Sequence, residues 1–265
     1  MSTVKSNDGT TIGFDRIGEG PPVVLVGGAF QHRAFDPRTQ QLAALLAERL
    51  SVYHYDRRGR GESGDTPPYA VGREIEDLDA LISHAGGSAA VYGESSGGNL
   101  ALEAAARGLA ITKIAVWEAN VLVDDSRPPL PHDYVQRLTE LSASDARDEA
   151  VAYFLTTAVG MPAEYLAPMR ETPMWAGMEA VANTLAYDGA VVGDGMAGAP
   201  AAAERWRTVT VPTLVLDGGQ TPWMSTGADA LAKALPRGQR RTLAGQEHGV
   251  AAEAIAPILT EFFTN

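Results

Sequence analysis

The stretch that decides the fold is VYGESSGG at residues 91–98, in which a G-x-S-x-G pattern surrounds Ser95. Residues 89–92 are apolar, as in a buried strand, and residues 99–106 are rich in Ala and Leu, which favours a helix. A serine at such a junction lies on a tight turn that exposes its hydroxyl, and Gly93 and Gly97 carry no Cβ that would keep neighbouring backbone away. The free N–H groups of the following helix would stabilise a developing negative charge at the same place. The stretch therefore predicts that Ser95 is a nucleophile.

Length, composition and charge limit the class of protein. The chain has 265 residues, of which 45% are hydrophobic and 20% charged, as expected for one large domain with room for an insertion. A net charge of −12 argues against nucleic acid and anionic membrane surfaces as partners. No apolar run has the length of a membrane span, the first residues lack a signal peptide's apolar core, and the absence of cysteine excludes disulfides and a thiolate nucleophile. We expect a cytoplasmic protein whose oligomeric state the sequence does not indicate.

Strand and helix signals alternate along most of the chain, which predicts an α/β protein with a largely parallel sheet. Continuous apolar runs or alternating patterns predict strands at residues 22–26, 51–55, 89–92, 111–117, 213–216 and 241–243. Apolar residues at helical spacing predict helices at 38–50, 72–84, 99–106, 228–235 and 252–263.

The alternation breaks between residues 118 and 209, where prolines and large apolar side chains are frequent and no strand is evident. We interpret residues 124–206 as a helical cap over the strand ends, and residues 1–123 and 207–265 as the core domain. Most of the large side chains should pack within the cap itself. Some should line a pocket, because ligands of α/β proteins bind at the carboxyl ends of the strands. We expect Met174, Trp175 and Tyr187 of the cap, with Phe30 of the core, to line that pocket.

Four segments in this order resemble the α/β-hydrolase family across essentially the whole chain. They are Val26–Phe30 with its Gly27-Gly28 pair, the D-x-R-G-x-G-x-S-like loop Tyr55–Ser63, the Ser95 turn, and the loop 244–249 that contains His248. The resemblance implies an α/β-hydrolase fold, with a mostly parallel central sheet flanked by helices and a helical cap inserted before the penultimate strand. It also implies that Asp56–Ser63 is a structural turn.

The same resemblance assigns roles to several residues. His248 would take the Ser95 proton as general base and return it to the leaving group. The backbone N–H groups of Ala29 and Ser96 would form the oxyanion hole. Gly27 departs from the family pattern, because a histidine that supports the loop usually stands there.

The acid of the triad is the open question. Family members most often carry an aspartate after the strand at 212–216. When Gly218 is aligned with the glycine of that family loop, Thr221 stands at the position of the aspartate. Two carboxylates are alternatives: Glu118, which follows the strand 111–117, and Asp217, which ends the later strand. A buried carboxylate at a strand end is costly without a partner, and a triad histidine would supply one. We favour Glu118 and keep Asp217 as the alternative acid.

A serine nucleophile argues against the epoxide and carbon–halogen hydrolysis that family members perform with aspartate at this turn. The leading hypothesis is a serine hydrolase that cleaves a small-molecule ester, lactone or thioester through a Ser-His-acid triad and an acyl-enzyme, without a metal or other cofactor. The aromatic and methionine content of the cap favours a substrate with an apolar or aromatic group. A ligand-binding pseudoenzyme remains an alternative because Thr221 replaces the usual acid. A non-hydrolytic biosynthetic enzyme, which would perform carbon–carbon cleavage or cyclisation, is another.

Overall fold

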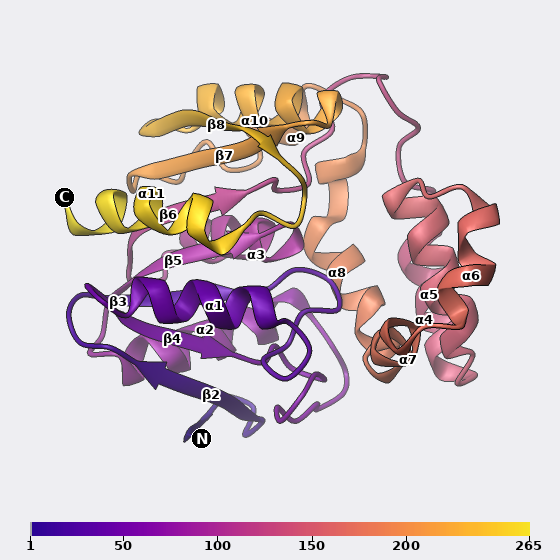
Figure 1. Cartoon of the computed structure of the whole chain (residues 1–265), viewed down its shortest axis with the longest axis horizontal. Helices are drawn as coiled ribbons and strands as arrows, with labels where there is room; N and C mark the ends of the chain where they lie inside the picture. Colours follow the sequence, from indigo (N-terminus) through magenta and orange to yellow (C-terminus); the bar gives the residue numbers. More distant parts are fainter. Residues whose placement is uncertain (1) are drawn as a thin grey trace.

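The computed structural model describes residues 2–265 and contains one eight-stranded sheet in the order β1-β2-β4-β3-β5-β6-β7-β8 (Figure 1). The strands are β1 (Ser2–Lys5), β2 (Thr11–Ile17), β3 (Pro22–Val26), β4 (Ser51–Tyr55), β5 (Ala89–Glu94), β6 (Ile111–Trp117), β7 (Thr213–Gly219) and β8 (Gly238–Gln246). Strands β1 and β2 pair antiparallel to their neighbours, and all other pairs are parallel. This arrangement confirms the predicted α/β fold with a mostly parallel sheet.

Helices cover both faces of the sheet. They are α1 (Pro37–Leu46) and α11 (Ala252–Thr264) on one face, and α2 (Val71–His84), α3 (Ser96–Ala106) and α10 (Pro222–Ala234) on the other. Successive residues of a strand point to opposite faces, so Val24 packs in the cluster with α2 and α3 while Leu25 packs with α1 and α11. Burial on both faces explains why the central strands read as continuous apolar runs.

Several details of the predicted elements were wrong, among them the last strand, predicted at 241–243 but observed over Gly238–Gln246. The strands β1 and β2 were not predicted, although Ile12 and Phe14 alternate with exposed or small residues and are fully buried. The helix predicted to reach residue 50 ends at Leu46, and Leu50 is buried in the turn that leads into β4. The helix predicted from residue 228 begins at Pro222, whose fixed φ is well suited to the first turn of a helix.

The connection between β6 and β7 is helical. It contains α4 (Tyr134–Ala143), α5 (Arg147–Tyr153), the π-helical segment η1 (Phe154–Val159), α6 (Leu166–Arg170), α7 (Pro173–Ala180), α8 (Leu185–Val192) and α9 (Ala201–Glu204), with short 3₁₀ turns between them. Helices α4 to α7 stand beside the sheet, and α8 lies between them and the core (Figure 1). A separate hydrophobic cluster, which includes Leu138, Val151 and Leu185, fills this helical unit. The division of the chain into a core and a cap at residues 124 and 206 stays a prediction.

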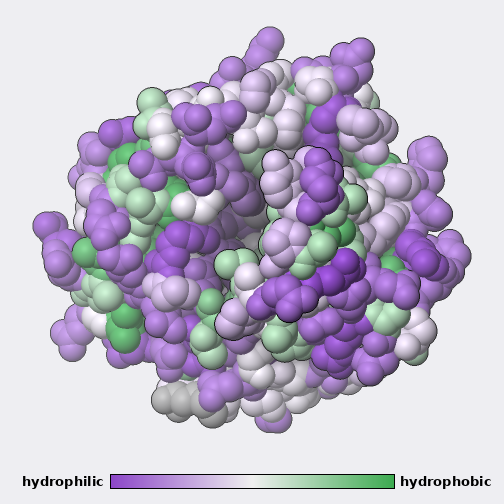
Figure 2. Space-filling model, turned by 45° about the vertical axis from the view of Figure 1, so that its right-hand side comes forward, coloured by the Kyte–Doolittle hydropathy of each residue, from purple (hydrophilic) through white to green (hydrophobic). Residues whose placement is uncertain are grey.

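The outer surface is mostly hydrophilic, with small scattered apolar patches and a recess near the middle of the face in Figure 2. None of the helices within residues 2–265 combines the length and the apolar character that a membrane crossing requires.

Candidate active site

Ser95 lies on the tight turn between β5 and α3, as the sequence predicted. Its backbone has φ 52° and ψ −125°, a conformation that costs energy for any residue with a side chain. The flanking glycines allow the turn: a Cβ on Gly97 would lie 2.2 Å from the Val26 carbonyl oxygen, and one on Gly93 would lie 2.4 Å from the Gly97 oxygen. The close approach of backbone is therefore what both glycines provide.

Glu118 and His248 contact each other directly. Glu118 follows β6, is 2% exposed, and its Oε2 lies 2.7 Å from His248 Nδ1. Its other carboxylate oxygen accepts a hydrogen bond from Gly218 N–H at 3.1 Å. When Nδ1 carries the ring proton and donates it to Glu118, Nε2 is left as a proton acceptor.

Asp217, the alternative acid, has other partners. Its carboxylate accepts a hydrogen bond from the Ser225 hydroxyl and forms an ion pair with Arg240 at 2.8 Å. Burial alone would raise the pKa of Asp217, but hydrogen bonds from Ser225, Thr242 and Arg240 hold it below the ordinary value. Of the two carboxylates, the structure brings only Glu118 to the His248 ring.

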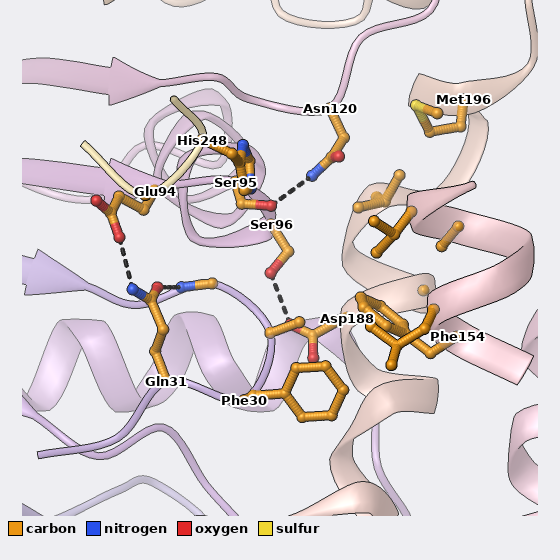
Figure 3. Close-up of a pocket in the computed structure, with 18 of the residues that line it drawn as sticks. Phe30, Gln31, Glu94, Ser95, Ser96, Asn120, Phe154, Asp188, Met196 and His248 are labelled. Carbon is orange, nitrogen blue, oxygen red and sulfur yellow. Dashed lines mark hydrogen bonds between the residues drawn. The ribbon is translucent and has the colours of Figure 1, made fainter. Parts of the chain in front are cut away.

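A cavity of about 480 Å³ opens between the strand ends and the helices of the β6–β7 connection. Its sheet side is lined by Ser95, Ser96 and His248, and Ala29 also lines the cavity. Its opposite wall is apolar and includes the π-helical residues Phe154, Leu155, Ala158 and Val159 with Met169, Met174, Met178 and Met196. Figure 3 shows Ser95 and His248 across the cavity from Phe154 and Met196.

Two of the four predicted pocket residues line this cavity and two do not. Phe30 and Met174 line it, and the Phe30 ring meets the Phe154 ring edge to face at 5.1 Å. Trp175 is instead buried inside the helical unit, where its indole N–H donates to Asp148 at 3.0 Å. Tyr187 stacks on Tyr69 at 3.8 Å, outside the cavity lining.

Asn120 is a site residue that the sequence did not indicate. Its side-chain amide donates to Ser95 Oγ at 3.2 Å, and Asn99 of α3 holds its backbone through two hydrogen bonds of 2.9 and 3.0 Å. Its only signal in the sequence is its position two residues after Glu118.

Hydrogen bonds of the Gln31 side chain hold the loop after β3 in place. Gln31 accepts a hydrogen bond from Gly28 N–H and donates one at 2.6 Å to Glu94, the residue directly before Ser95 (Figure 3). Ser96 is the first residue of α3, so its N–H has no acceptor within the helix and is available to the cavity. Ala29 lines the cavity next to it.

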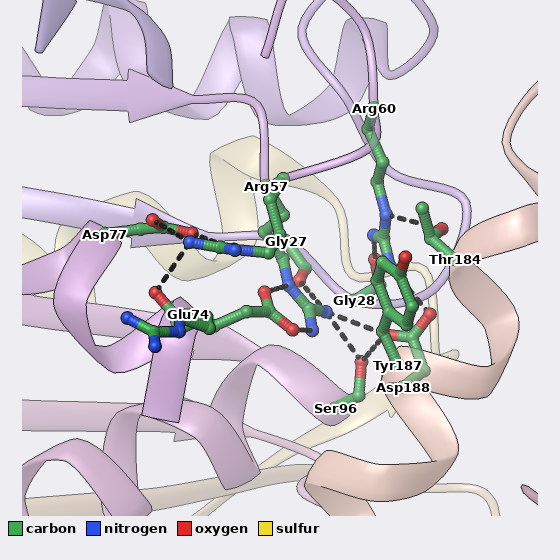
Figure 4. A network of polar contacts seen from close by, with 12 residues as sticks. Gly27, Gly28, Arg57, Arg60, Glu74, Asp77, Ser96, Thr184, Tyr187 and Asp188 are labelled. Atoms are coloured by element: carbon green, nitrogen blue, oxygen red, sulfur yellow. Dashed lines mark hydrogen bonds and ion pairs between the residues drawn. The ribbon is translucent and has the colours of Figure 1, made fainter. Parts of the chain in front are cut away.

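A buried ionic network, which the sequence did not indicate, lies beneath this loop (Figure 4). Asp188 of α8 accepts hydrogen bonds from Ser96 Oγ at 2.6 Å, Arg57 at 2.7 Å and Arg60 at 2.6 Å. Arg60 also donates to the Gly28 carbonyl oxygen at 2.5 Å. Burial would raise the pKa of Asp188, but the two guanidinium charges and the Ser96 hydroxyl keep it below the ordinary value. The network therefore links the β3 loop, the start of α3 and α8.

Comparison with known proteins agrees with this fold. The model of the alpha/beta hydrolase family matches residues 23–257, and the chain belongs to this family, as the sequence motifs predicted. A solved alpha/beta hydrolase from Sphaerobacter thermophilus is 54% identical, with 99% of this chain and 100% of that chain covered and a TM-score of 0.89.

More distant solved structures share the fold. A thermophilic esterase from Thermogutta terrifontis is 22% identical over 99% of this chain and 97% of its own, with a TM-score of 0.70. An enol-lactonase from Burkholderia xenovorans is 21% identical over the full length of both chains, with a TM-score of 0.68. No curated protein matches the chain significantly.

Proposed function

We propose that the protein is a serine hydrolase that cleaves a small-molecule ester, lactone or thioester, with Ser95, His248 and Glu118 as its triad. The observation that carries the proposal is the 2.7 Å contact between His248 Nδ1 and Glu118 Oε2, beside a cavity that Ser95 also lines. Glu118 thereby takes the role that Thr221 cannot perform, and this weakens the case for a pseudoenzyme.

The proposed reaction proceeds through an acyl-enzyme. Ser95 Oγ attacks the substrate carbonyl carbon while His248 Nε2 accepts its proton, and the N–H groups of Ala29 and Ser96 hold the resulting oxyanion. Collapse of this intermediate expels the alcohol or thiol, which takes the proton from His248. Water, activated by the same imidazole, then releases the acid and free Ser95. Glu118 orients the ring and stabilises the imidazolium form.

The choice of substrate class has two supports. The wall opposite Ser95 is apolar, which suits an aliphatic or aromatic group next to the scissile bond. The distant relatives of the same fold include an esterase and an enol-lactonase, and both names describe cleavage of an ester bond.

Labelling and turnover together test the proposal. The parent protein should hydrolyse short p-nitrophenyl esters and should gain one fluorophosphonate adduct by intact mass, and Ser95→Ala should abolish both. Ser83→Ala, which removes an exposed hydroxyl from α2, is the matched control and should retain both. A parent protein that neither turns over nor labels would refute the proposal in favour of a binding protein, and labelling without turnover of any ester, lactone or thioester would favour a non-hydrolytic reaction.

A further inference from the structure

Arg127 differs from every other charged residue in the lining of the Ser95 cavity. The others all have a partner of opposite charge within 2.7 Å: Arg38 with Glu94, Asp188 with Arg57 and Arg60, and His248 with Glu118. Within residues 2–265, Arg127 forms no ion pair with a carboxylate. The cavity therefore contains one guanidinium whose charge is not balanced by the protein.

Two contacts hold the Arg127 side chain in place. Its guanidinium carbon lies 5.0 Å from the centre of the Trp223 ring, and its Nη2 donates to the Thr157 carbonyl oxygen at 3.2 Å. A guanidinium has five N–H donors, so these contacts fix its orientation and leave donors for a ligand. Burial lowers the pKa of Arg127, which indicates a partly desolvated cation.

Tyr134 supplies a second, independent observation in the same lining. It is 3% exposed, and its hydroxyl is buried without a hydrogen-bond partner among the described residues. Its hydroxyl is close enough to both Asp188 and Arg127 to interact with their charges, which act on it in opposite directions. Buried hydroxyls are normally hydrogen-bonded, so the Tyr134 hydroxyl still has a hydrogen bond to give to an acceptor.

We propose that Arg127 and Tyr134 form a carboxylate-binding subsite, and that the substrates are esters, lactones or thioesters that carry a free carboxylate on the acyl side. A carboxylate would balance the guanidinium charge, accept from its free N–H groups in a fork and accept from the phenol. The apolar wall formed by η1 would then contact the methylene chain between the carboxylate and the scissile carbonyl. This substrate class rests on the proposed function at Ser95.

Half-esters of dicarboxylic acids test the subsite directly. The probes are the monoethyl esters of glutaric, adipic and pimelic acids, each compared with the neutral ethyl ester of the same acyl length, with ethanol release as the readout. At least one half-ester should exceed its neutral counterpart in kcat/KM by about 10- to 100-fold, as expected for a charge-assisted hydrogen bond. Arg127→Met should remove this preference mainly through KM, and Arg127→Lys should restore part of it. Arg137→Met, which removes a half-exposed arginine from α4, is the control and should keep the preference.

A binding measurement separates this proposal from the hydrolase proposal. Monoethyl adipate should bind to the Ser95→Ala protein in calorimetry, and its affinity should fall about 10-fold or more in Ser95→Ala/Arg127→Met, with thermal unfolding as the check that both variants fold. Arg127-dependent binding in a protein that hydrolyses no ester would support the subsite and refute the hydrolase. Hydrolysis of neutral esters with no preference for any half-ester, or a preference that survives Arg127→Met, would overturn the subsite and leave the hydrolase intact.

Discussion

Replacement of Asp188 by asparagine tests how strongly the buried ionic network stabilises the fold. The substitution preserves the shape of the side chain and removes its negative charge. Arg60 is 1% exposed, and Asp188, at 2.6 Å, is its ion-pair partner among residues 2–265. In the variant, the neutral Thr184 hydroxyl and the Gly28 carbonyl oxygen would remain as partners of the Arg60 guanidinium.

The size of the effect follows from this burial. Removal of one partner of a buried ion pair typically costs about 3–5 kcal/mol, because the other charge stays buried and uncompensated. Arg57 retains Glu74 at 2.6 Å and should add little to this loss. We therefore expect Asp188→Asn to lower the free energy of unfolding by about 3–5 kcal/mol, a large part of the roughly 5–15 kcal/mol typical of globular proteins.

Urea-induced unfolding, followed by tryptophan fluorescence, measures this change. Asp229→Asn is the matched control, because Asp229 is also ion-paired, to Arg240 at 2.7 Å, but its side chain is 69% exposed. The control should lose less than about 1 kcal/mol. The double variant Arg60→Met/Asp188→Asn should be more stable than Asp188→Asn, because it removes the unpaired cation as well. A loss in Asp188→Asn no larger than in the control would refute the reasoning.

Two further predictions concern the acid and a buried histidine. Glu118→Gln should lower kcat for ester hydrolysis by about 10³- to 10⁴-fold, because the amide no longer orients and stabilises the imidazolium, whereas Asp217→Asn should leave kcat nearly unchanged; the reverse order in steady-state rates would show that Asp217 is the acid. Burial lowers the pKa of His54 below its ordinary value of about 6.5, so between the lowered pKa and 6.5 the unfolded chain binds more protons and stability rises with pH. The loss of stability caused by the buried, unprotonated imidazole is absent above about pH 6.5 and grows as the pH falls. The unfolding free energy of His54→Gln should therefore depend less on pH between about 5 and 7 than that of the parent protein. Parallel pH profiles of the two proteins would exclude this contribution.

The parts of the fold that the sequence predicted are those where burial leaves a local pattern. Strand β3 is covered on both faces and reads as a continuous apolar run, Pro22–Val26. Strand β1 lies at the sheet edge with three of its four residues exposed, so it has no apolar pattern to detect. The Ser95 turn was predictable because its glycines are required by contacts within a few residues or with the neighbouring strand.

Side-chain partners across the cavity were not predictable in the same way. Ser96 and Asp188 are 92 residues apart in sequence, and only the fold brings them to 2.6 Å. The helices of the β6–β7 connection present a related difficulty, because consecutive helical residues differ in direction by about 100°. Met174 therefore lines the cavity while its neighbour Trp175 lies in the interior of the helical unit, and composition alone cannot tell the two apart.

One consequence follows for engineering, because Glu118, Asn120 and Arg127 all lie on the single connection that leaves β6 before α4. A chimaera joined at residue 124 would exchange Arg127 together with the foreign helices and keep the other two. A junction placed after Leu130 would retain all three from the recipient and import the apolar wall together with Tyr134 and Asp188. The crossover point, and not the identity of the donor helices alone, would then decide which chemical preference a hybrid enzyme inherits.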